Sequence, residues 1–127
     1  MKTEMRKYEF TRENKIICNG TVLHRIRALI DIDLGWKIVK AGELGGWVEK
    51  EGNLSHIGNC WVYGNAEVCG NAEVCENAKI CGDAKVCGDA KVCGDTKISG
   101  DAIVCGTNHI ADDACGSWIM SRFTKTE

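Results

Sequence analysis

Aliphatic residues recur at every sixth position through the central half of the chain. The column starts at Val62 and ends at Ile110, and a column of small residues, most of them alanine, lies two positions before it. Residues two apart on a strand share a face, so both columns are expected to point inward and the residue between them outward. The remaining positions hold Gly followed by Asn or Asp, as at Gly82 and Asp83, which bend the backbone readily. The pattern predicts short strands with a corner at every sixth residue.

A six-residue unit is too short to bury its apolar face alone, so the units are expected to stack into one continuous solenoid. If a coil has three sides of six residues, residues 18 apart lie on neighbouring rungs, about 4.8 Å from one another. The outward residues that this register brings together are Glu67 over Lys85, Glu73 over Lys91, and Lys79 over Lys97. Exposed pairs of this kind are worth about 0 to 1 kcal/mol, so they report the register more than they stabilise it.

The hexads between residues 64 and 111, such as GNAEVC and GDAKVC, resemble the hexapeptide-repeat family, in which an aliphatic residue is followed four positions later by a small one. This resemblance implies an all-β fold, a left-handed parallel β-helix that forms a triangular solenoid. The hexads continue backward through residues 58–63 and, more weakly, through 52–57, which places His56 in the aliphatic column. One scaffold of this kind serves many roles, so the family indicates the fold more than the function.

The N-terminal part of the chain follows a different pattern. Residues 7–11 alternate as a short strand, and residues 15–23 are typical of a β-hairpin that turns at Asn19 and Gly20. The second strand of the hairpin continues toward Ile30, with its residues alternating between two faces. Glycine-dense segments beside two tryptophans then predict tight turns around buried indoles.

These patterns divide the chain into three parts. Residues 1–51 form a small N-terminal β-rich cap, residues 52–115 form the hexapeptide-repeat β-helix, and residues 116–127 form a C-terminal cap strand or tail. Apolar side chains of this last part are expected to cover the open coil, which would otherwise be a sheet edge that recruits other chains. These end-cap residues are Trp118, Ile119 and Phe123.

Composition agrees with one small soluble domain. The chain has 127 residues and a net charge of -2, without a basic stripe, so nucleic acid is not an expected partner. It contains no apolar stretch long enough to span a membrane, and its first ten residues are too charged for a signal peptide. We therefore expect a cytoplasmic protein that does not bind membranes.

Six of the nine cysteines follow the aliphatic column by one residue, which places them outward at the strand ends: Cys69, Cys75, Cys81, Cys87, Cys93 and Cys105. They are expected to stack as Cys69, Cys87 and Cys105 on one side and as Cys75 and Cys93 on another. An odd number of cysteines without a secretion signal does not suit a disulfide framework, and a spacing of six does not suit zinc. We expect reduced, small side chains and no metal site, with metal binding and redox cross-linking as the alternatives.

The outward column that holds these cysteines begins with Tyr63. In relatives of the hexapeptide-repeat family this column is often aromatic, which implies a flat packing surface between protomers. We therefore expect a homo-oligomer, a trimer or a dimer, that packs through this column.

Acyl transfer is the enzymatic activity that the family resemblance implies, with a histidine as general base. The candidates are His24, His56 and His109, and none of them is flanked by an inserted loop. Their spacing also does not supply the three converging histidines of a carbonic anhydrase of this fold. We therefore expect no catalytic residue and no cofactor, and we keep an atypical or degenerate acyltransferase as the alternative.

The only compact basic cluster is His24, Arg25 and Arg27, which we expect to lie near Trp36, Trp47 and Tyr63. It is either a solvated strand face or a recognition site for an anionic ligand or a partner's carboxylates, which arginine binds through two parallel hydrogen bonds. The cap, the stretches LHRIRAL, GGWVEKEGNLS and NCWVYGNA, and the hexads together are similar to a group of uncharacterised hexapeptide-repeat proteins from phages, prophages and gut bacteria.

The leading hypothesis is a non-catalytic, oligomeric binding protein. By the phage resemblance it would be a phage-encoded modulator of a host process, including defence, that acts in the host cytoplasm by binding a host protein or a nucleotide-type ligand. A self-assembling structural protein is the third possibility.

Overall fold

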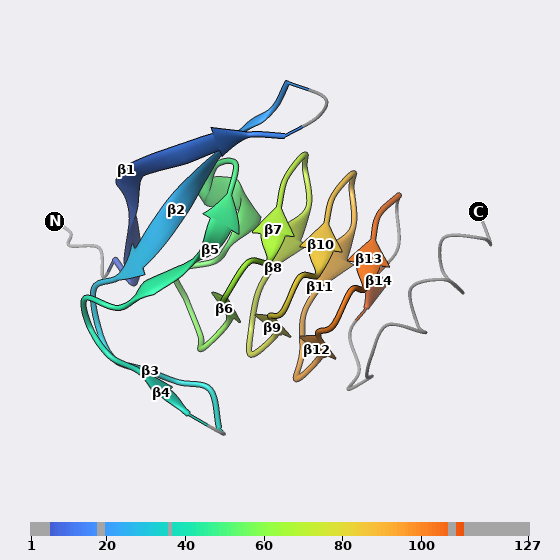
Figure 1. The fold of residues 1–127 in the computed structure, drawn as a ribbon. Helices are drawn as coiled ribbons and strands as arrows, with labels where there is room; N and C mark the ends of the chain where they lie inside the picture. The colour runs from blue at the N-terminus through green and yellow to red at the C-terminus, as the bar shows by residue number, and fades with distance from the viewer. Residues whose placement is uncertain (1–5, 18–19, 36, 107–108, 111–127) are drawn as a thin grey trace, which may run out of the picture.

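The protein is an all-β parallel β-helix of about three turns with an N-terminal β-hairpin layer (Figure 1). The computed structural model describes residues 6–17, 20–35, 37–106 and the backbone of 109–110. The N-terminal strands are β1 (Tyr8–Ile16), β2 (Val22–Ala28), β3 (Ile32–Asp33), β4 (Ile38–Val39) and β5 (Leu44–Val48), followed by the 3-10 turn η1 (Glu51–Asn53). The short strands of the coils are β6 (Trp61–Val62), β7 (Glu67–Val68), β8 (Glu73–Val74), β9 (Lys79–Ile80), β10 (Lys85–Val86), β11 (Lys91–Val92), β12 (Lys97–Ile98), β13 (Ile103–Val104) and β14 (His109–Ile110).

The coils stack as three parallel sheets, one on each side of the solenoid. Strands β7, β10 and β13 form one ladder, β8, β11 and β14 the second, and β6, β9 and β12 the third. Each strand aligns with the strand 18 residues further on, so Lys85 lies between Glu67 and Ile103. The predicted pairs Glu73 with Lys91 and Lys79 with Lys97 are aligned in the same way. The predicted 18-residue coil is therefore confirmed.

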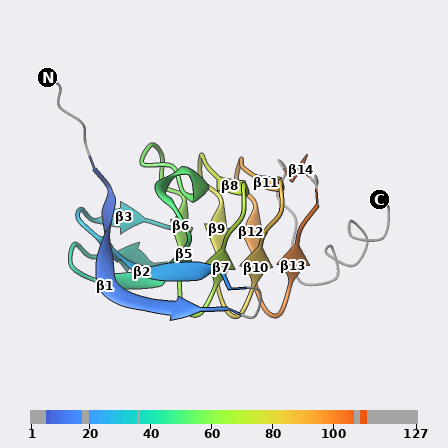
Figure 2. The same ribbon diagram turned by 90° about the horizontal axis from the view of Figure 1, so that it is seen from above.

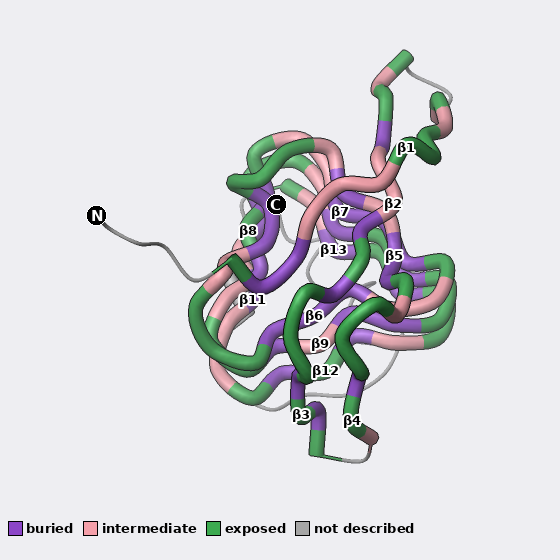
Figure 3. The backbone as a smooth tube through the Cα atoms, turned by 90° about the vertical axis from the view of Figure 1, so that its left-hand side faces the viewer, coloured by how far each residue is buried: buried purple, intermediate pink, exposed green. Residues whose placement is uncertain are grey.

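The interior of the solenoid holds the two inward columns. Val86, Val92 and Ile98 of the aliphatic column are completely buried, as are Ala84 and Ala90 of the small column. Seen along the axis, the buried strand positions surround the interior and the exposed corners lie at its perimeter (Figure 3). Side chains with branched Cβ atoms suit this position because they pack well on a pleated surface.

The first coil differs from the predicted hexads. Leu54, not His56, occupies the aliphatic position, since Leu54 is fully buried and forms a parallel bridge with Val74, 20 residues further on. Ile57 is 81% exposed. The physical reason is a bend at residues 56–59. Because of this bend, Leu54 and Val62 are separated by two more residues than a regular hexad provides. The weak backward extension of the repeat through residues 52–57 is thus wrong in its register.

The N-terminal strands continue one side of the solenoid. β1 and β2 form an antiparallel hairpin, β2 pairs with β5, and β5 pairs in parallel with β7, so that a six-stranded sheet runs β1-β2-β5-β7-β10-β13 (Figure 2). The predicted hairpin is confirmed, with Ile16 opposite Val22 and the Gly20 amide donating to the Ile17 carbonyl at 2.8 Å. β1 is one strand of nine residues, longer than expected. A register irregularity between Phe10 and Asn14 interrupts the alternation from which the strand was predicted, so the pattern showed only its first part.

Two outward positions of the first coils are covered, which corrects the expectation that they face solvent. Trp61 is fully buried, with its ring edge-on to Tyr8 at a centroid distance of 6.3 Å. Glu67 is 8% exposed. Its carboxylate forms an ion pair with Lys15 of the hairpin at 2.8 Å and not with Lys85, its aligned partner in the ladder. The hairpin layer lies over this part of the solenoid, so an outward side chain there is not a surface side chain. Nothing helical in the described ranges has both the length and the apolar character needed to cross a bilayer.

Candidate functional site

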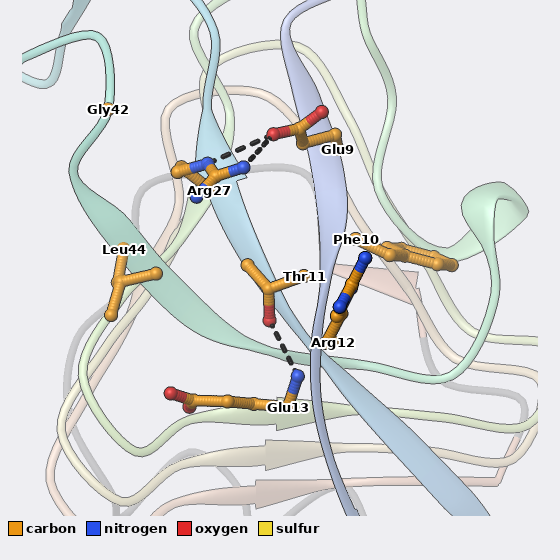
Figure 4. Close-up of a pocket in the computed structure, with 8 residues that line it drawn as sticks. All are labelled: Glu9, Phe10, Thr11, Arg12, Glu13, Arg27, Gly42 and Leu44. Carbon is orange, nitrogen blue, oxygen red and sulfur yellow. Dashed lines mark hydrogen bonds and ion pairs between the residues drawn. The ribbon is translucent and has the colours of Figure 1, made fainter.

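An open groove of about 620 Å³ lies on the hairpin layer (Figure 4). Strand β1 contributes most of its lining, β2 contributes Arg27, and Gly42 and Leu44 come from the start of β5 and the turn before it. Thr11 and Glu13 point toward Leu44 across the groove. Leu44 is 39% exposed, so the groove has an apolar patch among charged side chains. Its full lining is Glu9, Phe10, Thr11, Arg12, Glu13, Arg27, Gly42 and Leu44.

The charges of the groove are balanced. Arg27 donates from Nε to Glu9 Oε2 at 2.9 Å, and its terminal nitrogen contacts the same oxygen. Glu13 lies 3.8 Å from Arg25. Within the described part of the chain, Arg12 is exposed and has no ion-pair or hydrogen-bond partner. A ligand carboxylate could therefore bind Arg12 without displacing an existing partner.

A second feature is Trp47, on the outward side of β5 beside the groove. The Arg25 guanidinium lies 5.3 Å and the Lys15 ammonium 4.6 Å from a ring centroid of this half-buried indole. Arg25 is also tied down by a 2.9 Å hydrogen bond from Nε to the Gly45 carbonyl. Glycine is required at Gly45 because a Cβ there would lie 2.7 Å from the Trp61 ring. The structure thus brings together two residues of the predicted site, Arg25 and Trp47.

The other predicted site residues lie apart. His24 stacks on Phe10 with a centroid distance of 4.9 Å, whereas Arg25 and Arg27 alternate to the other face. The Lys37 ammonium donates a hydrogen bond to the Tyr63 hydroxyl at 3.1 Å and forms an ion pair with Glu43 at 2.8 Å. These contacts with Lys37 hold the pKa of Glu43 below its usual value. Trp36, Trp118, Ile119 and Phe123 lie outside the described residues.

Sequence reasoning missed a buried polar cluster where β1 meets the first coil. The Lys7 ammonium is buried and donates to the carbonyls of Gly58 and Cys60 at 3.1 and 2.7 Å, and it lies 3.2 Å from the Cys60 sulfur. Burial lowers the pKa of Lys7 and raises that of Cys60. The ring of Tyr8 stacks on His56 at 4.2 Å. The alternation of residues 7–11 placed Lys7 on a strand, but nothing in the sequence showed that its amine would meet two carbonyls 51 and 53 residues away.

His24 and His56, the two histidines whose side chains the structure describes, do not converge on the groove. His56 Nδ1 accepts the Lys7 backbone N–H at 3.1 Å, and its Nε2 lies 3.6 Å from Glu51. This ring is therefore already engaged in holding β1 to the first coil. The backbone of His109 pairs with Lys91 in β14, and its side chain lies outside the described part.

The cysteines form the predicted columns. Their amides repeat one hydrogen bond along the solenoid, from Cys69 to the Val86 carbonyl at 2.9 Å and from Cys87 to the Val104 carbonyl at 2.8 Å. Five of the six are half-buried, but Cys81 is buried at 9% exposure, which differs from the outward surface position expected for it. All seven cysteines in the described ranges carry thiols.

Neighbouring thiols of a column interact. The Cys87 thiol beside it lowers the pKa of Cys69, and the Cys69 thiol, together with burial, raises the pKa of Cys87. Burial and the neighbouring Cys93 raise the pKa of Cys75 to about 11.

Among the described residues, no group of three or more His, Cys, Asp or Glu side chains is arranged to hold a metal ion. No protein-family model matches the chain, and no curated protein matches it.

Proposed function

We propose that the protein is a non-catalytic binding module that takes up a segment of a protein partner in the groove between β1 and β5. The observation that carries this proposal is the open groove of about 620 Å³, with exposed Leu44 on one side and unpartnered Arg12 at its rim. An apolar patch with a few polar groups around it is the usual composition of a small recognition site. The rigid sheet beneath the groove supports the proposal because it lowers the entropy lost on binding.

The charge pattern favours a protein over a nucleotide or nucleic acid. Arg27 is paired with Glu9, and Glu13 lies near Arg25, so the groove offers no cluster of free positive charge for phosphates. Lys15 and Arg25 already lie over Trp47, which leaves its ring less open to stacking by a base. A segment with one carboxylate and one apolar side chain would match Arg12 and Leu44.

We also propose that the chain belongs among the hexapeptide-repeat proteins and winds with a left hand. The six-residue spacing of the corners supports this, since Gly64, Gly70, Gly82 and Gly88 all have φ close to +70°. The phage origin, action in the host cytoplasm, and a dimer or trimer packed through the Tyr63 and cysteine columns are further parts of this proposal. Sedimentation equilibrium of the full chain measures the oligomeric state directly.

The experiment that tests the groove compares partner capture by matched variants. Purified tagged protein, the variants Leu44→Asp and Arg12→Glu, and the control Lys85→Glu are incubated with lysate of a candidate host, and captured proteins are quantified. Lys85 is exposed on β10, away from the groove lining, so its variant carries the same kind of charge change elsewhere. A partner that binds wild type and Lys85→Glu but neither groove variant supports the proposal. A partner lost equally from all three variants, or from none, contradicts it.

Calorimetry with coenzyme A addresses the acyltransferase alternative. Saturable binding that is weakened by His109→Ala would favour an enzyme over a binding module. We expect no binding heat, since His24 is stacked on Phe10 and His56 is hydrogen-bonded to the Lys7 amide.

A further inference from the structure

The cysteine columns place thiols in register on successive rungs of the solenoid. Cys69, Cys87 and Cys105 directly follow Val68, Val86 and Val104, which are aligned partners in one parallel ladder. Cys75 and Cys93 follow Val74 and Val92 of a second ladder in the same way. Because each side of the coil repeats the same backbone conformation, the sulfurs of a column are separated by about the strand spacing, roughly 4.8 Å.

This spacing matches one kind of metal coordination. A zinc–thiolate bond is about 2.3 Å long, and with a metal–sulfur bond of similar length two sulfurs on opposite sides of one ion are about 4.6 Å apart. Soft thiolate ligands select Cu(I), zinc and iron–sulfur clusters, and the last two are held by four protein donors in structural sites. We propose that the two cysteine columns are binding sites for Cu(I), with each ion held linearly between the sulfurs of adjacent rungs.

The binding step is a proton exchange and needs no oxidant. Two thiols of a column each release one proton and bind Cu(I) as thiolates, which leaves a site with one net negative charge. In the longer column the pair Cys69 and Cys87 or the pair Cys87 and Cys105 can hold an ion, but both pairs share the middle sulfur. The columns therefore bind one ion each.

Other uses of the same thiols fit the geometry less well. Tetrahedral zinc needs four donors, and the described residues offer no group of even three metal-ligating side chains. A disulfide needs Cβ atoms about 3.8 Å apart, so adjacent rungs would have to approach by about 1 Å. The solenoid resists this approach because its rungs are joined by regular backbone hydrogen bonds of 2.8 to 3.0 Å beside these cysteines.

The third side of the solenoid supplies a control. Cys81 occupies the same position after β9, but the residues 18 positions before and after it are Tyr63 and Ser99. Its sulfur has no thiol on an adjacent rung. If copper binding depends on stacked thiols, replacing Cys81 must leave the number of bound ions unchanged. If any cysteine can bind copper, replacing Cys81 would lower that number.

The test titrates the full chain anaerobically with Cu(I) held as its coloured bicinchoninate complex and counts the ions that the protein removes. We expect Cys81→Ser and Cys105→Ser to bind as many ions as wild type, because Cys69 and Cys87 remain adjacent in both. We expect Cys87→Ser and Cys93→Ser each to bind one ion fewer. Far-ultraviolet circular dichroism checks that every variant keeps its β structure.

The same samples give a second readout. X-ray absorption at the copper edge should show two sulfur neighbours at one short distance. The proposal is overturned if wild type removes no copper from the chelator, if Cys81→Ser loses as many ions as Cys87→Ser, or if the absorption data show three or four sulfurs around each ion.

Discussion

The corner glycines offer a direct test of how closely the coils stack. Gly88 has φ of +69°, and a Cβ built on it would lie 2.8 Å from the backbone nitrogen of Gly106 on the next coil. Gly64 has nearly the same φ, +70°, but a Cβ there would meet the Gly82 carbonyl oxygen and nitrogen at ordinary contact distances of 3.6 and 3.7 Å. Alanine at the two sites therefore suffers the same backbone strain, and only Gly88→Ala adds a clash between coils.

The magnitudes separate the two variants. A left-handed conformation costs a residue with a Cβ about 1 to 2 kcal/mol, which is the expected loss in Gly64→Ala. A methyl group that must push the next rung away adds about 1 to 3 kcal/mol, so Gly88→Ala should lose about 2 to 5 kcal/mol. A small domain is stable by only about 5 to 15 kcal/mol, so this difference is readily measured.

Urea denaturation followed by circular dichroism gives the free energy of unfolding of wild type and both variants. The slope of the free energy against urea should be unchanged, since the same surface is exposed on unfolding. Equal losses in the two variants would refute the reasoning, because they would mean that the corners of successive coils are not in contact at Gly88.

Three further predictions concern the first coils and the thiols. Trp61→Ala should lower the free energy of unfolding by about 3 to 5 kcal/mol in urea denaturation, because it empties a fully buried site; a loss below about 1 kcal/mol would contradict the burial. Asn53→Ala should cost about 1 to 3 kcal/mol, since Asn53 donates to the Gly70 and Ala72 carbonyls at 3.2 and 2.8 Å and its removal leaves these acceptors without that donor. Asn59→Ala, at an exposed position of the same coil, is its control and should change little. Cys75 has a pKa raised in the folded state from about 9 to about 11, so its contribution to stability is complete below pH 9 and is lost as the pH rises through 11. Thermal denaturation from pH 8 to 11 should therefore show a smaller alkaline loss for Cys75→Ser than for wild type, and identical slopes would be evidence against this shift.

The hairpin layer also explains why the cap and the solenoid are expected to unfold together. Lys15 and Glu67 join them through an ion pair, and β5 belongs to the same hydrogen-bonded sheet as β7. Lys7, directly before β1, adds hydrogen bonds to residues 58 and 60 of the first coil. Most single domains of fewer than about 150 residues unfold in one cooperative transition, and these contacts join the cap to the solenoid in one such domain.

The sequence by itself determined the solenoid. A six-residue period with inward aliphatic and small columns can bury its apolar side chains in only one way, by stacking, and the register of Lys91 with Glu73 follows from counting. The hairpin turn near Gly20 could be predicted equally well, because the residue types that favour such a turn are adjacent in the sequence. Both are local or strictly periodic features, so no knowledge of distant contacts was needed to predict them.

Tertiary structure alone decided what lies on the solenoid and where its period breaks. Leu54 lies in the interior in place of His56 because the bend at 56–59 contains two extra residues. The hexad pattern does not predict this change. Trp61 and Glu67 hold outward positions of the repeat, yet they are buried because a hairpin from another part of the chain covers them. The groove likewise exists only because β1, β2 and β5 meet, and such contacts depend on the path of the whole chain rather than on any local pattern.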